Sequence, residues 1–105
     1  MIRAKKSLGQ NFLTSRAVVS DIVSAAALTE NDTVLEIGPG KGILTESLLQ
    51  VSKKVFAIEK DRELIPHLKE KFADEIASKK LELICDDILN ISLSELITED
   101  FKVVA

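Results

Sequence analysis

The sequence has little cysteine, histidine, proline or glycine: one Cys, one His, two Pro and four Gly among 105 residues. One cysteine cannot form an internal disulfide, so a disulfide-stapled fold is excluded and a reducing, intracellular setting is expected. One His and one Cys also leave a transition-metal site without its usual ligands. Because 46% of the residues are hydrophobic and glycine and proline are scarce, a collagenous or disordered chain is excluded as well.

Long hydrophobic runs are also lacking. The longest, residues 25–28 and 55–58, have four residues each, whereas a membrane-spanning helix needs about 20. Arg3, Lys5 and Lys6 near the start are not followed by an apolar segment, so we expect no signal peptide. We predict a cytoplasmic protein without a membrane partner.

The balance of charge is slightly acidic, with 14 Lys and Arg against 17 Asp and Glu and a net charge of −3. A protein that gripped nucleic acid over its whole surface would usually be basic. Any contact with RNA is therefore expected to be local. Arg3, Lys5 and Lys6 form the one basic cluster that we single out for phosphate contacts.

Short β-branched runs alternate along the chain with longer helical stretches, which predicts a doubly wound α/β sheet of parallel strands with helices on both faces. Residues 1–13 have no clear period and are expected to form an arm before the strand and helix units of residues 14–105. The predicted strands are residues 33–37, 54–58, 81–85 and 101–105. The predicted helices are residues 14–28, 43–51 and 61–77, with Asp61 as the N-cap of the third, and a short helix after the capping-box pattern Ser92-x-x-Glu95.

The last predicted strand, from Phe101 to Ala105, begins where the sequence ends. A complete doubly wound sheet has more strands, so we expect a truncated domain that stops after the start of the fourth strand. An exposed sheet edge of this kind favours self-association.

The turn after the first strand is rich in glycine, with Gly38, Gly40 and Gly42 at alternate positions. In open parallel sheets the first strand-to-helix turn commonly forms the floor of a ligand site. Gly38 and Gly40 are expected to adopt positive φ and to let a ligand approach the backbone closely. Gly42 is expected to allow tight packing of the next helix on the strand.

Two common nucleotide motifs do not match this turn. A dinucleotide fingerprint would place its third glycine where Ile43 stands, and the P-loop pattern is absent. Pro39 also removes one backbone N–H from the turn, which weakens a cradle for pyrophosphate. The pattern Glu36-x-Gly38-x-Gly40-x-Gly42 instead resembles the binding loop of class I S-adenosylmethionine-dependent methyltransferases.

Acidic residues follow the next two strands. Glu59 ends the second strand, 19 residues after Gly40, where a carboxylate can accept both hydroxyls of a ribose. Asp86 and Asp87 close the third strand, where a carboxylate can accept a hydrogen bond from an adenine amino group. Beside them, Cys85 is expected to be buried. His67 is expected to lie on a helix surface without a role.

Four segments together resemble the ribosomal RNA small-subunit adenine dimethyltransferase family (KsgA type). They are Lys-Ser-Leu-Gly-Gln-Asn-Phe-Leu at 6–13, Leu-Glu-Ile-Gly-Pro-Gly-Lys-Gly-Ile-Leu-Thr at 35–45, Ile-Glu-Lys-Asp at 58–61 and Asp-Asp-Ile-Leu at 86–89. The resemblance covers essentially the whole chain. It implies a Rossmann-like methyltransferase fold with S-adenosylmethionine as cofactor.

The resemblance also implies roles for individual residues. Asn11 and Leu13 would close over the cofactor, Gly38 would contact its methionine part and Glu59 its ribose. The residues implied for the adenine are Asp87 and Ile88, and those implied as supporting are Glu36, Gly40, Gly42 and Lys60.

The implied reaction transfers two methyl groups to each of two adjacent adenosines near the 3′ end of small-subunit ribosomal RNA, so the implied partner is that RNA or the immature small subunit. The target base must leave its stack to react. The family binds the acceptor amine with an N-[LI]-P-[YF] motif after the fourth strand. This motif would begin just after Ala105, so residues 1–105 contain no catalytic residue of the family. We therefore expect them to bind cofactor without catalysing methyl transfer.

Three other interpretations remain. The first is the related large-subunit methyltransferase family of macrolide resistance, against which Gly9 argues because that family usually lacks a Gly before Gln-Asn-Phe. The second is a nicotinamide-dependent oxidoreductase, which Ile43 disfavours. The third is a non-catalytic RNA-binding or ribosome-assembly module, supported only by the basic cluster near the start of the chain.

Overall fold

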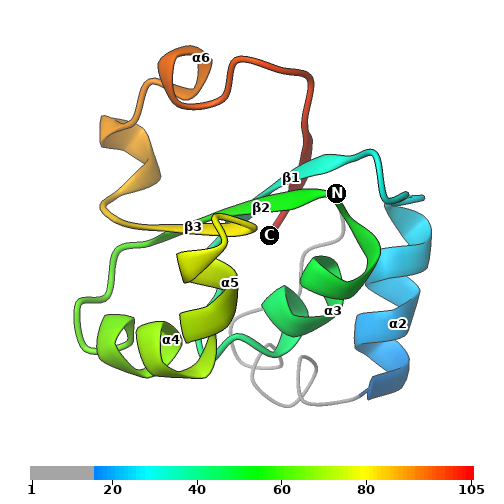
Figure 1. The fold of residues 1–105 in the computed structure, drawn as a ribbon, viewed down its shortest axis with the longest axis horizontal. Coiled ribbons are helices and arrows are strands. Elements are labelled where there is room, and N and C mark those ends of the chain that lie inside the picture. The colour runs from blue at the N-terminus through cyan, green and yellow to red at the C-terminus, as the bar shows by residue number, and fades with distance from the viewer. Residues whose placement is uncertain (1–15) are drawn as a thin grey trace.

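Four parallel strands form one sheet in the order β3-β2-β1-β4 in the computed structural model, which describes residues 16–105 (Figure 1). The strands are β1 (Thr33–Ile37), β2 (Lys54–Glu59), β3 (Leu81–Cys85) and β4 (Lys102–Val104). The helices are α2 (Arg16–Ala25), α3 (Ile43–Val51), α4 (Ile65–Lys71), α5 (Ala73–Ala77) and α6 (Leu93–Leu96), with a 3₁₀ turn η1 (Ile88–Asn90). The predicted α/β fold with parallel strands is confirmed.

The central strand of the sheet is almost completely buried. β1 pairs with β2 on one side and with β4 on the other, and four of its five residues are buried. A strand that is covered on both faces has a nearly continuous run of apolar residues in its sequence. Such a run is the signal that predicts a strand at residues 33–37. The strands predicted at 33–37 and 81–85 have those bounds in the structure.

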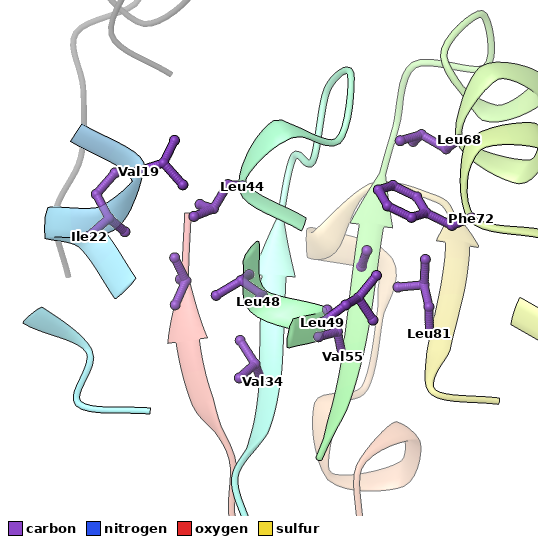
Figure 2. Packing of buried hydrophobic residues seen from close by; sticks show 12 residues of the cluster. Val19, Ile22, Val34, Leu44, Leu48, Leu49, Val55, Leu68, Phe72 and Leu81 are labelled. Carbon is purple, nitrogen blue, oxygen red and sulfur yellow. The ribbon is translucent and has the colours of Figure 1, made fainter. Parts of the chain in front are cut away.

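One face of the sheet is covered by α2, α3, α4 and α5 (Figure 1). Leu44, Leu48 and Leu49 of α3 recur at helical spacing and pack toward the strands (Figure 2). Leu68 and Phe72 lie beside β2 in the same view and extend this core toward β3. Since this face carries Val34 and Val55 from the central strands, it holds the main hydrophobic core.

In the described part of the chain, the opposite face is covered by η1, α6 and the segments that join them (Figure 1). Its fully buried residues are Leu35, Phe56, Ile58 and Ile97, and the other apolar residues packed there are half-buried. Leu89 of η1 is 89% exposed and Val103 of β4 is 41% exposed. Because side chains alternate along a strand, Leu35 faces this side while its neighbours Val34 and Glu36 face α3.

Two predicted helices differ from the structure. The helix predicted at 14–28 ends at Ala25, because Ala27 takes a left-handed φ of 51°. The helix predicted at 61–77 is two helices that break at Phe72, with φ −114° and ψ 31°. Asp61 was predicted as its N-cap, but the helix begins at Ile65, and the Asp61 carboxylate accepts a bond from the N–H of Glu63 in the turn before it.

The edge strands differ from the prediction in two details. Cys85 is exposed rather than buried, because it ends β3, an edge strand of the sheet. The strand predicted at 101–105 is shorter and covers Lys102–Val104. The prediction is wrong at Phe101 and Ala105, because β4 pairs with β1 only from Lys102 to Val104. Val104, the last residue of β4, lies opposite Glu36.

Two further predictions concern the arm and the short helix. Ser92 stands at the N-cap of α6 without a capping hydrogen bond from its side chain, so the predicted capping box is wrong. The predicted arm 1–13 lies outside the described residues.

Within residues 16–105, every helix is too short or too polar to cross a membrane.

Candidate functional site

The glycine turn between β1 and α3 borders open space. Gly38 has φ +73° and Gly40 has φ +59°, so both adopt the left-handed region, as predicted. A Cβ atom added to either residue would meet no heavy atom of residues 16–105 within 4 Å. The N–H of Gly38 donates to the carbonyl of Ile58 at 2.9 Å and so fastens the turn to the end of β2. The backbone at these two glycines is therefore open to a close approach by a ligand.

Gly42 has a different role. It also has a positive φ, +89°, but a Cβ there would lie 2.6 Å from the Phe72 ring and 3.2 Å from Leu68. The prediction that Gly42 allows packing of the helix on the strand is wrong. Its missing side chain instead makes room for the residues that follow β2, so the turn and α4 pack directly against each other.

Glu59 connects the ends of β1 and β2. Its side chain is 6% exposed, and its carboxylate accepts one hydrogen bond from the N–H of Gly40 and one from the N–H of Asp61, both at 3.0 Å. A carboxylate has about four lone-pair positions, so two remain for other donors. Glu59 thus holds the glycine turn and still has the capacity to accept hydroxyl groups.

A second carboxyl, Glu36, lies beneath the same turn. It is 2% exposed, and the hydroxyl of Thr45, itself 1% exposed, donates to its Oε1. Burial raises the pKa of Glu36 to about 7, and the charge of Glu59 acts in the same direction, while the bond from Thr45 opposes the shift. Thr45 was not singled out from the sequence, although a threonine among the apolar residues of a helix face is a signal of a buried hydrogen bond.

The end of β3 lies beside the end of β2, because the N–H of Asp86 donates to the carbonyl of Glu59 at 3.1 Å. Asp87 is half-buried, and its carboxylate accepts a bond from the N–H of Leu89 at 2.9 Å. Ile88 is also half-buried and packs against the apolar cluster on the η1 and α6 face. Asp87 therefore follows the strand next to Glu59.

The helix α4 reaches the glycine turn from outside. The Nε2 atom of His67 lies 3.2 Å from the carbonyl oxygen of Lys41, and the Nζ atom of Lys71 donates to the same oxygen at 3.4 Å. His67 is exposed, as predicted, but it contacts the turn that borders the site. The sequence carries no signal of this contact, because it joins residues 26 positions apart.

Comparison with known proteins shows the family of the chain. The sequence pattern of the family described as ribosomal RNA adenine dimethylase matches residues 1–105. The chain belongs to the ribosomal RNA adenine dimethylase family.

Curated relatives of this dimethylase chain include ribosomal RNA small subunit methyltransferase A of Mycoplasmopsis synoviae, which is 48% identical over 97% of this chain and 38% of its own length. The protein of the same name from Alkaliphilus metalliredigens is 45% identical over 95% of this chain and 34% of its length. The chain thus spans about a third of the length of these relatives.

Solved structures with a similar fold include a dimethyladenosine transferase from Plasmodium falciparum, with 33% identity, a TM-score of 0.66 and coverage of 74% of this chain and 28% of that one. A 23S rRNA methyltransferase, ErmE, has 33% identity, a TM-score of 0.68 and coverage of 78% and 32%. The predicted methyltransferase fold is confirmed.

The predicted site residues are gathered only in part. The structure joins Gly40 to Glu59 directly and brings Gly38 to the end of β2. Lys60 is exposed one residue beyond β2, and the contacts predicted for Asp87 and Ile88 with an adenine remain predictions. The remaining predicted residues, Asn11, Leu13, Arg3, Lys5 and Lys6, lie outside the described residues.

The charge of the site bears on which kind of ligand would fit there. Two buried carboxyls, Glu36 and Glu59, flank the turn, and burial of negative charge disfavours an anionic pyrophosphate. A cationic ligand with free hydroxyls suits these groups, and the open space beside Gly38 and Gly40 leaves room for it. S-adenosylmethionine has both properties, so the residues present fit it. Among residues 16–105, no cluster of three metal-ligating side chains is found.

Proposed function

We propose that the protein carrying this sequence is an S-adenosylmethionine-dependent dimethyltransferase that modifies adjacent adenosines near the 3′ end of small-subunit ribosomal RNA. Residues 1–105 would be the cofactor-binding part of its catalytic domain. The observation that carries the proposal is the glycine turn, held by Glu59 at the ends of the parallel strands, in a chain of the ribosomal RNA adenine dimethylase family. Such an enzyme acts on ribosomal subunits in the cytoplasm.

The cofactor-binding roles follow the ends of the strands. Gly38 would contact the methionine part, Glu59 the ribose hydroxyls, and Asp87 with Ile88 the adenine. When bound, the cofactor supplies an electrophilic methyl group. Glu59 has two functions here, because the carboxylate that would accept the ribose hydroxyls already fixes the N–H of Gly40. Loss of this carboxylate should therefore loosen the turn as well as remove a ligand contact.

The arm would complete the cofactor site. Asn11 and Leu13 would close over the bound cofactor, and Arg3, Lys5 and Lys6 would contact RNA phosphates. Glu36, Gly40, Gly42 and Lys60 would support the site. The family's motif for the acceptor amine is not among residues 1–105, so these residues alone would transfer no methyl group.

A methyl-transfer assay tests the function. The protein that carries this sequence, supplied with S-adenosylmethionine labelled in its methyl group, should label small ribosomal subunits that lack the two dimethyladenosines. The Glu59→Gln variant should lose most of this labelling through weaker cofactor binding. Glu70→Gln removes an exposed carboxyl from α4 and serves as the matched control, which should keep full activity. Small subunits that stay unlabelled would refute the proposed function.

A large-subunit substrate is the second candidate. The observation in its favour is that the chain is as identical in sequence to the 23S rRNA methyltransferase structure as to the dimethyladenosine transferase structure. The relatives at 48% and 45% identity carry small-subunit names and favour the first candidate. The same assay with purified large subunits separates the two, since each candidate predicts label in only one kind of subunit. RNA binding without any label would indicate the assembly module.

A further inference from the structure

The glycine turn is held from two sides, by the end of β2 and by α4. On the β2 side, the carbonyl of Ile58 accepts a bond from the N–H of Gly38 at 2.9 Å. The Glu59 carboxylate accepts a bond from the N–H of Gly40 at 3.0 Å. These bonds fix the first half of the turn. The second half, which begins at Lys41, has no such bond to β2 among the described residues.

The second half of the turn bonds to α4 instead. The carbonyl oxygen of Lys41 lies 3.2 Å from Nε2 of His67 and accepts a bond from Nζ of Lys71 at 3.4 Å. Since a carbonyl oxygen can only accept, Nε2 of His67 carries a proton and donates it. His67 and Lys71 are four residues apart and therefore lie on one face of the helix. Two side chains thus donate to a single acceptor.

A second pair of side chains from α4 and its C-cap contacts the next residue of the turn. A Cβ added at Gly42 would lie 3.2 Å from Leu68 and 2.6 Å from the Phe72 ring. Both side chains are buried and lie beside β2 (Figure 2). This apolar pair limits how far α4 and the turn can approach each other. It offers no donor, so the direction of the Lys41 carbonyl depends on the polar pair.

Lys71 also connects the turn to the helix that follows it. Its Nζ lies 3.5 Å from the carboxylate of Glu46, in the first turn of α3, and 5.5 Å from the centroid of the Phe72 ring. The ammonium group of Lys71 therefore lies between α4, the Lys41 carbonyl and the start of α3.

We propose that His67 and Lys71 are positioning residues of the cofactor site, which keep the glycine turn in its binding conformation through the carbonyl of Lys41. The inference rests on the proposed function, because this turn is the part of the site assigned to the methionine part of S-adenosylmethionine. A protein that adopts its binding conformation only part of the time has its affinity reduced by that fraction. Loss of both donors therefore weakens cofactor binding without removal of a ligand contact.

The shared acceptor makes the effects of the two donors interdependent. Removal of either donor leaves the other bond in place, so His67→Phe and Lys71→Met should each weaken S-adenosylmethionine binding by at most about twofold. The double variant leaves the carbonyl without a side-chain donor and should weaken binding about tenfold, more than the product of the single effects. Phe keeps a ring at position 67, and Met keeps most of the aliphatic stem at position 71.

Three further variants separate donation from other effects. His67→Gln in the Lys71→Met background restores an amide donor near the position of Nε2, so its affinity should lie within about twofold of that of Lys71→Met alone. Glu46→Gln removes the ion pair of Lys71 but leaves both donors, and it should bind as wild type does. Lys69→Ala changes an exposed position on α4 and serves as the matched control, which should have no effect.

Isothermal titration with S-adenosylmethionine, on the protein that carries this sequence, measures these affinities. In the methyl-transfer assay, the double variant should show a KM for S-adenosylmethionine about tenfold higher and an unchanged kcat, since saturating cofactor restores the turn. In the free double variant, hydrogen exchange should become faster at the N–H groups of Gly40 and Gly42, which bond within the site. A merely structural role would lower the midpoint of unfolding and leave all three readouts unchanged.

Each outcome of these measurements decides the proposal. If S-adenosylmethionine binds wild type and the double variant equally, the positioning role is wrong and the proposed function stands. A loss in the double variant no larger than the product of the single losses would overturn the shared role of the two donors. So would a failure of His67→Gln to recover affinity in the Lys71→Met background. If wild type neither binds S-adenosylmethionine nor labels ribosomal subunits, the positioning role and the proposed function both fail.

Discussion

The face of the sheet covered by α2, α3, α4 and α5 is packed far more completely than the face covered by η1 and α6. Among the described residues, the first face buries side chains from every strand and from three helices, whereas the second buries only Leu35, Phe56, Ile58 and Ile97. The second face also leaves Leu89 largely exposed. Since apolar burial is the main source of stability, the first face should dominate the free energy of folding.

The site is divided between these two regions. The glycine turn is fixed by groups of the well-packed face, namely Thr45 of α3 through Glu36, and Phe72 and Leu68 against Gly42. Asp87 instead leads into η1, whose residues are exposed or half-buried. The half of the site expected to bind methionine and ribose is therefore held by more buried contacts than the half expected to bind adenine.

The largest contrast between the faces is expected from truncation of leucine side chains. Leu48→Ala removes a fully buried side chain from α3 and should lower the free energy of unfolding by about 4 kcal/mol. Leu93→Ala truncates a half-buried leucine on α6 and should cost about 1 kcal/mol. Urea denaturation measures both, and equal losses would contradict the assigned difference between the faces.

The ionisation of Glu36, which lies on the well-packed face, should make the free energy of unfolding depend on pH. The pKa of Glu36 is about 7 in the folded chain against an ordinary value of 4.5, so the folded state binds more protons between these values. Stability from this group is therefore complete below pH 4.5 and is lost as the pH rises to 7, by about 3 kcal/mol in total.

Glu36→Gln should remove this slope and make the chain more stable than wild type at pH 8. Glu95→Gln, which removes an exposed carboxyl from α6, is the control on the other face and should leave the slope unchanged. Chemical denaturation at a series of pH values measures the effect. A wild-type slope that persists in Glu36→Gln would assign the pH dependence to other groups.

The third contrast lies within the glycine turn itself. Gly42→Ala places a methyl group against the Phe72 ring at a positive φ and should destabilise the chain by about 2–4 kcal/mol. Gly38→Ala has a similar φ but open space, so its cost should be only about 1–2 kcal/mol. Phe72→Leu should offset part of the loss in Gly42→Ala but none in Gly38→Ala. Thermal unfolding of the single and combined variants measures these losses of stability. Equal losses of stability in Gly42→Ala and Gly38→Ala would refute the contact with Phe72.

The smallest effect is expected at Lys102, which ties the edge strand β4 to the end of α2. Its Nζ donates to the carbonyls of Ala26 and Ala27, at 3.3 and 2.9 Å, and lies 3.2 Å from the Asp32 carboxylate. Lys102→Ala should cost about 1 kcal/mol, because these bonds are exposed. Lys69→Ala, an exposed position on α4, is the matched control and should be neutral within about 0.5 kcal/mol. If Lys102→Ala loses no more stability than this control, the bonds of Lys102 contribute nothing to the free energy of unfolding.

The sequence predicts the parts of the fold in which local pattern and tertiary packing agree. β1 (residues 33–37) is rich in apolar and β-branched side chains, and it lies in the buried centre of the sheet. The predicted helix at 61–77 shows where the sequence pattern fails. The apolar spacing of Leu64, Leu68 and Phe72 continues through the break between α4 and α5, so only the backbone conformation of Phe72 reveals that break. Cys85 was assigned to the core from alternation alone, but a strand at the sheet edge lacks a covering neighbour.

The site could be predicted only as far as its residues lie at the ends of strands. The turn and Glu59 follow directly from the order of strands, and the bond between Gly40 and Glu59 joins them as expected for neighbours in a sheet. The partner of Glu36 could not be predicted, because Thr45 lies nine residues away on another element and matches no spacing rule. The steric role of Gly42 likewise depends on Phe72, 30 positions later, which reaches the turn only after the chain has folded.

The proposed ligand at the ends of β1 and β2 is a nucleoside that carries a sulfonium rather than a pyrophosphate. Isothermal titration of the chain with S-adenosylmethionine and with NAD⁺, under identical conditions, distinguishes these two kinds of ligand. We expect saturable binding of S-adenosylmethionine that weakens at least tenfold in Glu59→Ala, and no measurable heat with NAD⁺. Binding of NAD⁺ as tight as that of S-adenosylmethionine, or an affinity for S-adenosylmethionine unchanged in Glu59→Ala, would contradict this expectation.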